Sequence, residues 1–115
     1  TDDIRESQAI KIIDALLEYG FSINITDPEG MNNARKYYKD NKNIIFHNQI
    51  YECLEDVDAL LLLTEWKEFH SPDFRKMKKC MKKPIIFDGR NIYDRNKLIS
   101  LGYTYFEIGV KGDGE

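Results

Sequence analysis

The chain has 115 residues, of which 42% are hydrophobic and 12% aromatic, enough to fill one core and too many for a disordered protein. Its 17 basic and 20 acidic residues give a net charge of -3, which argues against a protein that coats nucleic acid. The longest apolar run, residues 59–63, is far shorter than the ~20 residues that span a bilayer, and no signal segment opens the chain. We therefore expect a single cytoplasmic domain over residues 1–115, with no membrane or nucleic-acid partner.

The first half of the chain alternates helical and extended patterns. Residues 3–20 predict a helix, because Asp3 and Glu6 have capping-box spacing, apolar residues recur at helical period, and Gly20 suits the C-terminal cap. Residues 21–26 predict a strand, which Asp27-Pro28 ends. A helix is expected over 29–38, a short strand over 43–47, and a short helix over 49–54.

The second half continues the alternation. Residues 59–64 are apolar on both faces, which favours a parallel strand covered on both sides. A helix is expected over 72–81, a strand over 84–88, a helix over 94–100 that Gly102 closes, and a last strand over 103–108.

This order predicts an α/β fold, a three-layer α/β/α Rossmann-like domain with a mainly parallel sheet of about five strands. The pattern begins with a helix, whereas nucleotide-binding sheets of this kind usually begin with a central strand. The first strand of the fold is therefore expected to be missing. The gap would close if strands 22–26 and 59–64 paired directly, which we favour, or if a neighbouring copy supplied a strand.

Several chemically suggestive residues have simpler explanations. Six of the nine residues 75–83 are cationic, but the cations face away from Phe74, Met77 and Met81, as on a solvated helix. His47 and His70 have no ligand partner at zinc spacing. The two cysteines, Cys53 and Cys80, are expected to be reduced thiols. Trp66 is expected to be a core or interface anchor, and Glu65 to bond backbone amides or serve a site.

Two arginines are candidate binding residues. Arg90 follows the strand over 84–88, where open parallel sheets bind ligands, and a guanidinium there can fork onto phosphate or sugar oxygens. Gly89 before it permits close backbone approach or a positive φ. Equally, Arg90 could pair with Asp88 or Asp94. Arg5 lies at a helix start, and on the residues alone it is a surface charge beside Glu6.

Three segments together resemble the C-terminal UDP-binding domain of UDP-glucose/GDP-mannose dehydrogenases. They are Thr-Asp-Asp-Ile-Arg-Glu-Ser at 1–7, Ala-Leu-Leu-Leu-Leu-Thr-Glu-Trp at 59–66, and Pro-Ile-Ile-Phe-Asp-Gly-Arg-Asn at 84–91. Their order and spacing match, and the resemblance covers essentially the whole chain.

The resemblance implies an enzyme that oxidises the C6 hydroxyl of a UDP-sugar to a carboxylate with NAD. It implies that Arg90 binds the UDP-sugar and that Arg5 reaches the cofactor across a domain interface. It also implies that NAD is bound mainly by an N-terminal domain, that a central region supplies the catalytic cysteine, and that the full-length enzyme is a homo-oligomer. By the same resemblance, both regions are expected to lie outside this chain, together with the first strand and its substrate-binding lysine.

Neither Cys53 nor Cys80 matches the family's catalytic cysteine, and the chain has no GxGxxG or GxxxxGK[ST] motif. The fragment alone is therefore expected to be inactive. A different interpretation is a stand-alone α/β module for nucleotide binding or oligomerisation, without catalysis.

Overall fold

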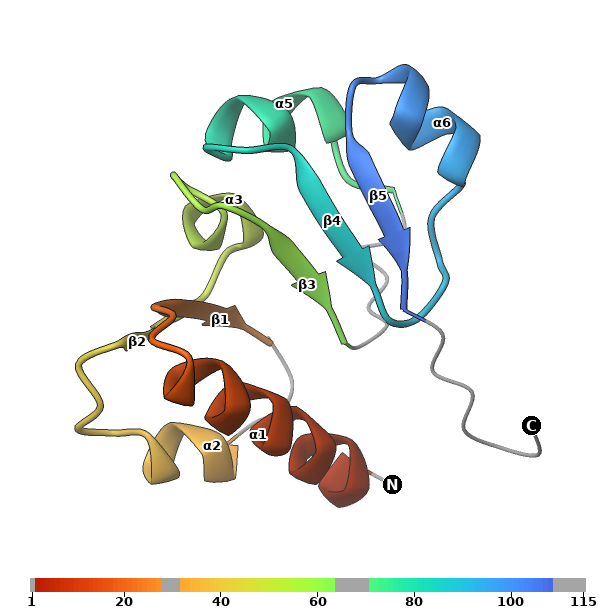
Figure 1. Ribbon diagram of the computed structural model, residues 1–115. Helices are drawn as coiled ribbons and strands as arrows, with labels where there is room; N and C mark the ends of the chain where they lie inside the picture. The colour runs from red at the N-terminus through yellow and green to blue at the C-terminus, as the bar shows by residue number, and fades with distance from the viewer. Residues whose placement is uncertain (1, 28–31, 64–70, 109–115) are drawn as a thin grey trace. The chain divides into compact units, whose positions relative to one another are not determined.

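A computed structural model describes residues 2–27, 32–63 and 71–108, with the backbone alone for residues 2–6. The chain divides into two compact units, Thr1–Cys53 and Leu54–Glu115, and each is described by itself. Figure 1 labels the helices and strands of both units. In the part of the chain that the structure describes, no helix has both the length and the apolar character needed to cross a membrane.

The first unit is a two-stranded parallel sheet with three helices. Its elements are α1 (Asp2–Glu18), β1 (Ile23–Thr26), α2 (Asn32–Tyr37), β2 (Ile44–His47) and α3 (Ile50–Cys53). Ile23 of β1 stands opposite Ile44 of β2. Gly20 has a φ of 89°, the left-handed conformation expected of the residue that ends α1.

Tyr38, which directly follows α2, contacts α1 in the first unit. The buried core of this unit is formed by residues of α1, α2, the turn after α2 and the two strands, namely Ile13, Ala34, Tyr38, Ile25 and Ile44. The Tyr38 hydroxyl donates a hydrogen bond of 2.6 Å to the Asp14 carboxylate on α1. Burial and this bond raise the pKa of Tyr38 above its ordinary value. The neutral hydroxyl therefore holds α1 against the core at any ordinary pH.

The second unit is a three-stranded parallel sheet in the order β3-β4-β5. Its elements are β3 (Leu60–Leu62), α5 (Phe74–Cys80), β4 (Ile85–Asp88), α6 (Arg95–Ser100) and β5 (Thr104–Glu107). Each helix carries the chain from the end of one strand to the start of the next strand in the sheet. The core includes Met77 of α5, Ile86 of β4 and Leu98 of α6, whose side chains are fully buried.

Helix α5 confirms the prediction for the cationic segment. Phe74, Met77 and Met81 are buried, while the lysines and the arginine of residues 75–83 are exposed. The Lys78 ammonium donates to the carbonyl of Leu101 at 3.0 Å, near the C-terminal end of α6. The segment is thus a solvated helix face with a local capping role.

The predicted elements are all present where the structure describes them, and within each of the two sheets the strands run parallel. The α/β fold class is therefore confirmed. The expectation of one continuous sheet is wrong, because the strands form a two-stranded and a three-stranded sheet. The expectation that residues 59–64 form an inner strand is also wrong, since β3 lies at the edge of its sheet.

Direct pairing of β1 with β3 was the favoured way to close the gap, and it does not occur: β1 pairs with β2, and β3 with β4. With three residues, β3 offers few backbone hydrogen bonds to such a pairing. A strand supplied by a neighbouring copy stays a prediction.

Candidate functional site

The carboxyl ends of the three strands of the second unit meet at Asp88 and Gly89. The Gly89 amide donates to the carbonyl of Leu62, which ends β3, at 2.8 Å, and the Ile108 amide donates to the carbonyl of Asp88 at 3.0 Å. A Cβ on Gly89 would lie 2.9 Å from the Leu62 oxygen. Of the two roles expected for this glycine, close backbone approach is therefore the one that applies.

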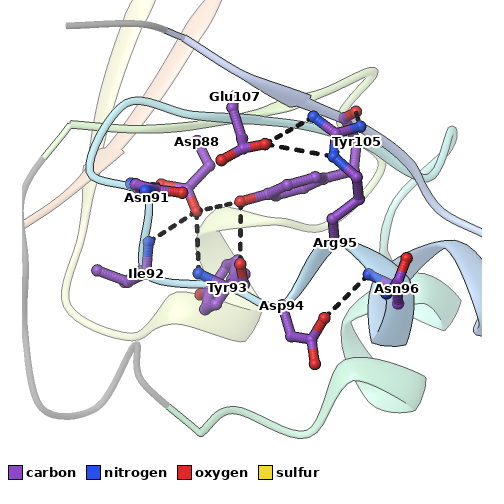
Figure 2. Close-up of polar contacts among 9 residues, drawn as sticks. All are labelled: Asp88, Asn91, Ile92, Tyr93, Asp94, Arg95, Asn96, Tyr105 and Glu107. Atoms are coloured by element: carbon purple, nitrogen blue, oxygen red, sulfur yellow. Dashed lines mark hydrogen bonds and ion pairs between the residues drawn. The ribbon is translucent and has the colours of Figure 1, made fainter. Parts of the chain in front are cut away.

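Asp88 organises the loop that follows β4. Its side chain is fully buried, and both of its oxygens accept hydrogen bonds (Figure 2). Oδ1 accepts from the backbone amides of Arg90 at 2.9 Å and Asn91 at 2.7 Å. Oδ2 accepts from the amides of Ile92 at 3.0 Å and Tyr93 at 3.1 Å. Four consecutive amides thus converge on one carboxylate, which fixes the backbone of residues 90–93.

Tyr105 of β5 supplies a fifth donor to Asp88. Its hydroxyl donates to Asp88 Oδ2 at 2.6 Å, and its side chain is 4% exposed. Arg95 lies over the Tyr105 ring, with the guanidinium carbon 5.4 Å from the ring centre. The same guanidinium pairs with Glu107 at 2.7 Å, as Figure 2 shows. We call Asp88, Tyr105 and the amides of residues 90–93 the Asp88 network.

The Asp88 network keeps the carboxylate ionised. Burial alone would raise the pKa of Asp88, but the hydrogen bonds from Tyr105 and from the amides of Arg90, Tyr93 and Asn91 outweigh it. The pKa of Asp88 is therefore below its ordinary value. Burial and the bond to Asp88 raise the pKa of Tyr105, so its hydroxyl keeps its proton.

Because Asp88 is ionised in the folded chain, we expect the second unit to lose stability at acid pH. Because its pKa is lower in the folded than in the unfolded chain, its contribution is present above about pH 4, the unfolded pKa, and is lost as the pH falls through the folded pKa. The measurement compares urea unfolding of the chain and of Asp88→Asn between neutral and acid pH. The difference in unfolding free energy should shrink below about pH 4; a difference that stays constant contradicts the prediction.

Arg90 is part of this loop and is exposed. Its backbone amide, not its side chain, makes the bond to Asp88 described above. The Asp94 carboxylate caps α6 by accepting from the amides of Asn96 at 3.0 Å and Lys97 at 3.4 Å. Asp88 and Asp94, the two carboxylates named above as possible partners of the Arg90 side chain, both accept hydrogen bonds from backbone amides. The residue lies at the carboxyl end of a parallel sheet, as predicted for a ligand-binding position.

The other candidate residues are less fully described. Arg5 belongs to α1 in the first unit, but its side chain lies outside the described residues, as do Glu65, Trp66 and His70. Arg5 is in the first unit and Arg90 is in the second, so the position of each residue is described only within its own unit. Among residues 2–27, 32–63 and 71–108, no three His, Cys, Asp or Glu side chains gather as a metal site.

Both cysteines are free thiols, as predicted. Burial of Cys53 at the end of α3 raises its pKa to about 12. A thiol with that pKa is protonated at neutral pH, and a protonated thiol is a poor nucleophile. That neither cysteine is the catalytic one stays a prediction.

Sequence reasoning considered Asp88 only as a partner for the Arg90 side chain and gave Tyr105 no role. The usable signal was an aspartate that ends an otherwise apolar strand directly before glycine. Such a residue is buried by its strand position and must find donors, which the next loop offers through its backbone. Tyr105 had no comparable signal, because its partner lies 17 residues away on another strand.

The fold and this loop define a parallel α/β domain of the kind that binds ligands at the carboxyl ends of its strands. Residues 1–95 match the family model of the UDP-glucose/GDP-mannose dehydrogenase family, UDP binding domain. The chain belongs to this family.

Curated relatives agree with the family match. The chain is 40% identical over 109 residues to a UDP-glucose 6-dehydrogenase of Rhizobium meliloti, covering 95% of this chain and 24% of that protein. It is 36% identical over 112 residues to a UDP-glucose 6-dehydrogenase of Pseudomonas aeruginosa, covering 95% of this chain and 25% of that protein. The chain thus spans about a quarter of the length of these relatives.

A solved structure supports the fold. The UDP-D-ManNAc dehydrogenase of Pyrococcus horikoshii superposes with a TM-score of 0.53 at 20% identity, over 88% of this chain and 30% of that one. At this identity the likeness concerns the fold alone.

Proposed function

We propose that this chain is the nucleotide-sugar-binding domain of an NAD-dependent UDP-sugar 6-dehydrogenase that converts UDP-glucose to UDP-glucuronate. The observation that carries the proposal is the place of Arg90, exposed at the carboxyl end of a parallel sheet on a loop fixed by Asp88. The relatives named UDP-glucose 6-dehydrogenase support glucose as the sugar.

Arg90 would recognise the charged part of the ligand. A guanidinium presents a planar set of N–H donors that matches phosphate oxygens two at a time. The loop amides of residues 90–93 already donate to Asp88, so they do not form a backbone cradle for phosphate. Binding at this loop therefore depends on side chains, and Arg90 is the cation among them.

NAD is the proposed cofactor of the complete enzyme. This chain carries no glycine-rich dinucleotide motif, and Arg5 is the one residue that we assign to the cofactor. In the complete enzyme NAD would accept the hydride that leaves C6 of the sugar. The role of this chain is to bind the substrate through Arg90 and to meet the cofactor through Arg5.

The remaining roles belong to other parts of such an enzyme. The N-terminal and central domains of the same enzyme are the proposed protein partners, in a cytoplasmic homo-oligomer. By the family resemblance, the catalytic cysteine is assigned to the central domain and to neither Cys53 nor Cys80. The chain by itself would then bind ligand without turning it over.

Titration of the 115-residue chain tests this proposal. We expect UDP and UDP-glucose to give heat in calorimetry and to shift the amide signals of residues 89–93 in NMR spectra, because Arg90 lies on that loop. NAD+ should bind far more weakly, since the chain lacks a dinucleotide motif. With UDP-glucose and NAD+ together, no NADH should form.

Two results would contradict it. Production of NADH by the purified chain would show that it holds a complete active site. Failure of UDP at millimolar concentration to shift the signals of residues 89–93 would remove the nucleotide site from this loop. The chain would then be better described as a module without nucleotide binding.

A further inference from the structure

The Asp88 carboxylate faces the loop that carries Arg90 and is closed to solvent. It is fully buried and accepts five hydrogen bonds, four from consecutive amides and one from Tyr105. A carboxylate has about four lone-pair positions, so these donors saturate it. Asp88 therefore has no acceptor position left for a ligand, and the hydrogen bonds that it makes act on the loop.

The loop depends on this acceptor for its conformation. Asn91 has a φ of 58°, in the left-handed region that non-glycine residues seldom occupy. Its amide makes the shortest of the four backbone bonds to Asp88, at 2.7 Å. Directly before it, the Arg90 amide donates to the same oxygen at 2.9 Å. The backbone on both sides of the Arg90 side chain is thus set by one buried oxygen.

Tyr105 holds the carboxylate in the orientation that this arrangement needs. Rotation of the carboxylate about its last bond would exchange Oδ1 and Oδ2 or draw both away from the loop. The Tyr105 hydroxyl binds Oδ2 from the side of β5, and its ring is fixed by burial and by Arg95 above it. Figure 2 shows the hydroxyl between the Asp88 carboxylate and the Tyr93 carbonyl, to which it lies at 3.3 Å.

We propose that Asp88 and Tyr105 are positioning residues for nucleotide-sugar binding: together they hold the loop that presents Arg90 to the phosphates. This inference rests on the proposed function and adds two residues that act on the ligand only through Arg90. It assigns the hydroxyl of Tyr105, remote from solvent, a measurable effect on affinity for UDP.

The test uses a pair of matched substitutions in the 115-residue chain. Tyr105→Phe removes the hydroxyl that binds Asp88 and keeps the ring. Tyr103→Phe is the control: Tyr103 is also 4% exposed, and its hydroxyl donates to the carbonyl of Phe74 at the start of α5. Each variant loses one buried hydroxyl group and keeps its ring. If the role of Tyr105 were purely structural, both substitutions would have the same small effect on UDP binding.

We expect Tyr105→Phe to weaken the affinity for UDP about tenfold, the lower end of what loss of an outer hydrogen-bond partner costs at metal sites. Amide hydrogen exchange of residues 90–93 should become faster in the same variant. Tyr103→Phe should change neither quantity. Asp88→Asn, which replaces one acceptor oxygen by a donor, should act in the same direction as Tyr105→Phe and more strongly.

The outcomes separate this inference from the proposed function. If the unaltered chain binds UDP and Arg90→Ala weakens binding, but Tyr105→Phe binds as well as the unaltered chain, the positioning role is wrong and the function stands. Unchanged exchange of residues 90–93 in Tyr105→Phe overturns the positioning role as well. Absence of UDP binding by the unaltered chain overturns the proposed function, and this inference falls with it.

Discussion

Replacing Arg90 by alanine in a full-length dehydrogenase that carries this domain is expected to raise the KM for the UDP-sugar strongly and to leave the affinity for NAD+ nearly unchanged. Removing the guanidinium leaves a charged phosphate without its partner, a loss of about 2–5 kcal/mol where the pair is buried in the complex. Steady-state kinetics with each substrate varied in turn measure the two effects separately.

Arg90→Lys should recover little of this loss. An ammonium keeps the positive charge but cannot donate two parallel hydrogen bonds from one plane. A full recovery by lysine would mean that charge alone is needed at this position.

Arg75→Ala is the matched control. Arg75 is an exposed arginine on α5, on the solvated face of that helix, and its loss should change neither KM. Unchanged UDP-sugar kinetics in Arg90→Ala would return Arg90 to a structural role in its loop.

Local patterns in the sequence predicted the helices and strands of this chain correctly because each pattern reports contacts within a few residues. The apolar periods of α1 and α5 and the glycine after α1 all act within one or two turns. The pairing of strands, in contrast, is decided by contacts between residues far apart in the sequence. Whether β3 has one neighbour or two depends on segments far from it in the chain, and here the expectation of an inner strand was wrong.

The candidate site was likewise predicted only where its features depend on residues close together in the sequence. The position of Arg90 at a strand end followed from the apolar run of β4 and the glycine after it, and the structure agrees. The role of the glycine did not follow, because the contact that requires it is the carbonyl of Leu62 on another strand. The Asp88 network was also missed, since a carboxylate's donors are fixed by loop geometry and by β5.

A substitution of Asp88 by alanine should be among the most destabilising in the second unit. The amides of Arg90 and Asn91 can turn to water, because both residues are exposed. The Tyr93 amide and the Tyr105 hydroxyl cannot, because the bonds that they make to Asp88 are buried. The Tyr93 amide is then left without a partner, which costs about 1–3 kcal/mol. The Tyr105 hydroxyl keeps only its 3.3 Å bond to the Tyr93 carbonyl and loses a bond to a charged group, worth about 1.5–3 kcal/mol. We therefore expect a loss of about 2–6 kcal/mol.

Asp94→Ala provides the comparison for this prediction, because it also removes an aspartate that accepts bonds from backbone amides. Asp94 is exposed at the start of α6, and loss of such a cap costs about 0.5–2 kcal/mol. Urea unfolding of both variants at neutral pH, followed through amide signals of the second unit, measures the two losses. The free energy of unfolding should fall clearly more in Asp88→Ala than in Asp94→Ala. Water can replace the acceptor at an exposed helix cap, but it cannot reach the buried donors that bind Asp88. Equal losses would mean that water also enters the Asp88 network, and the loop of Arg90 would then be held by its other contacts.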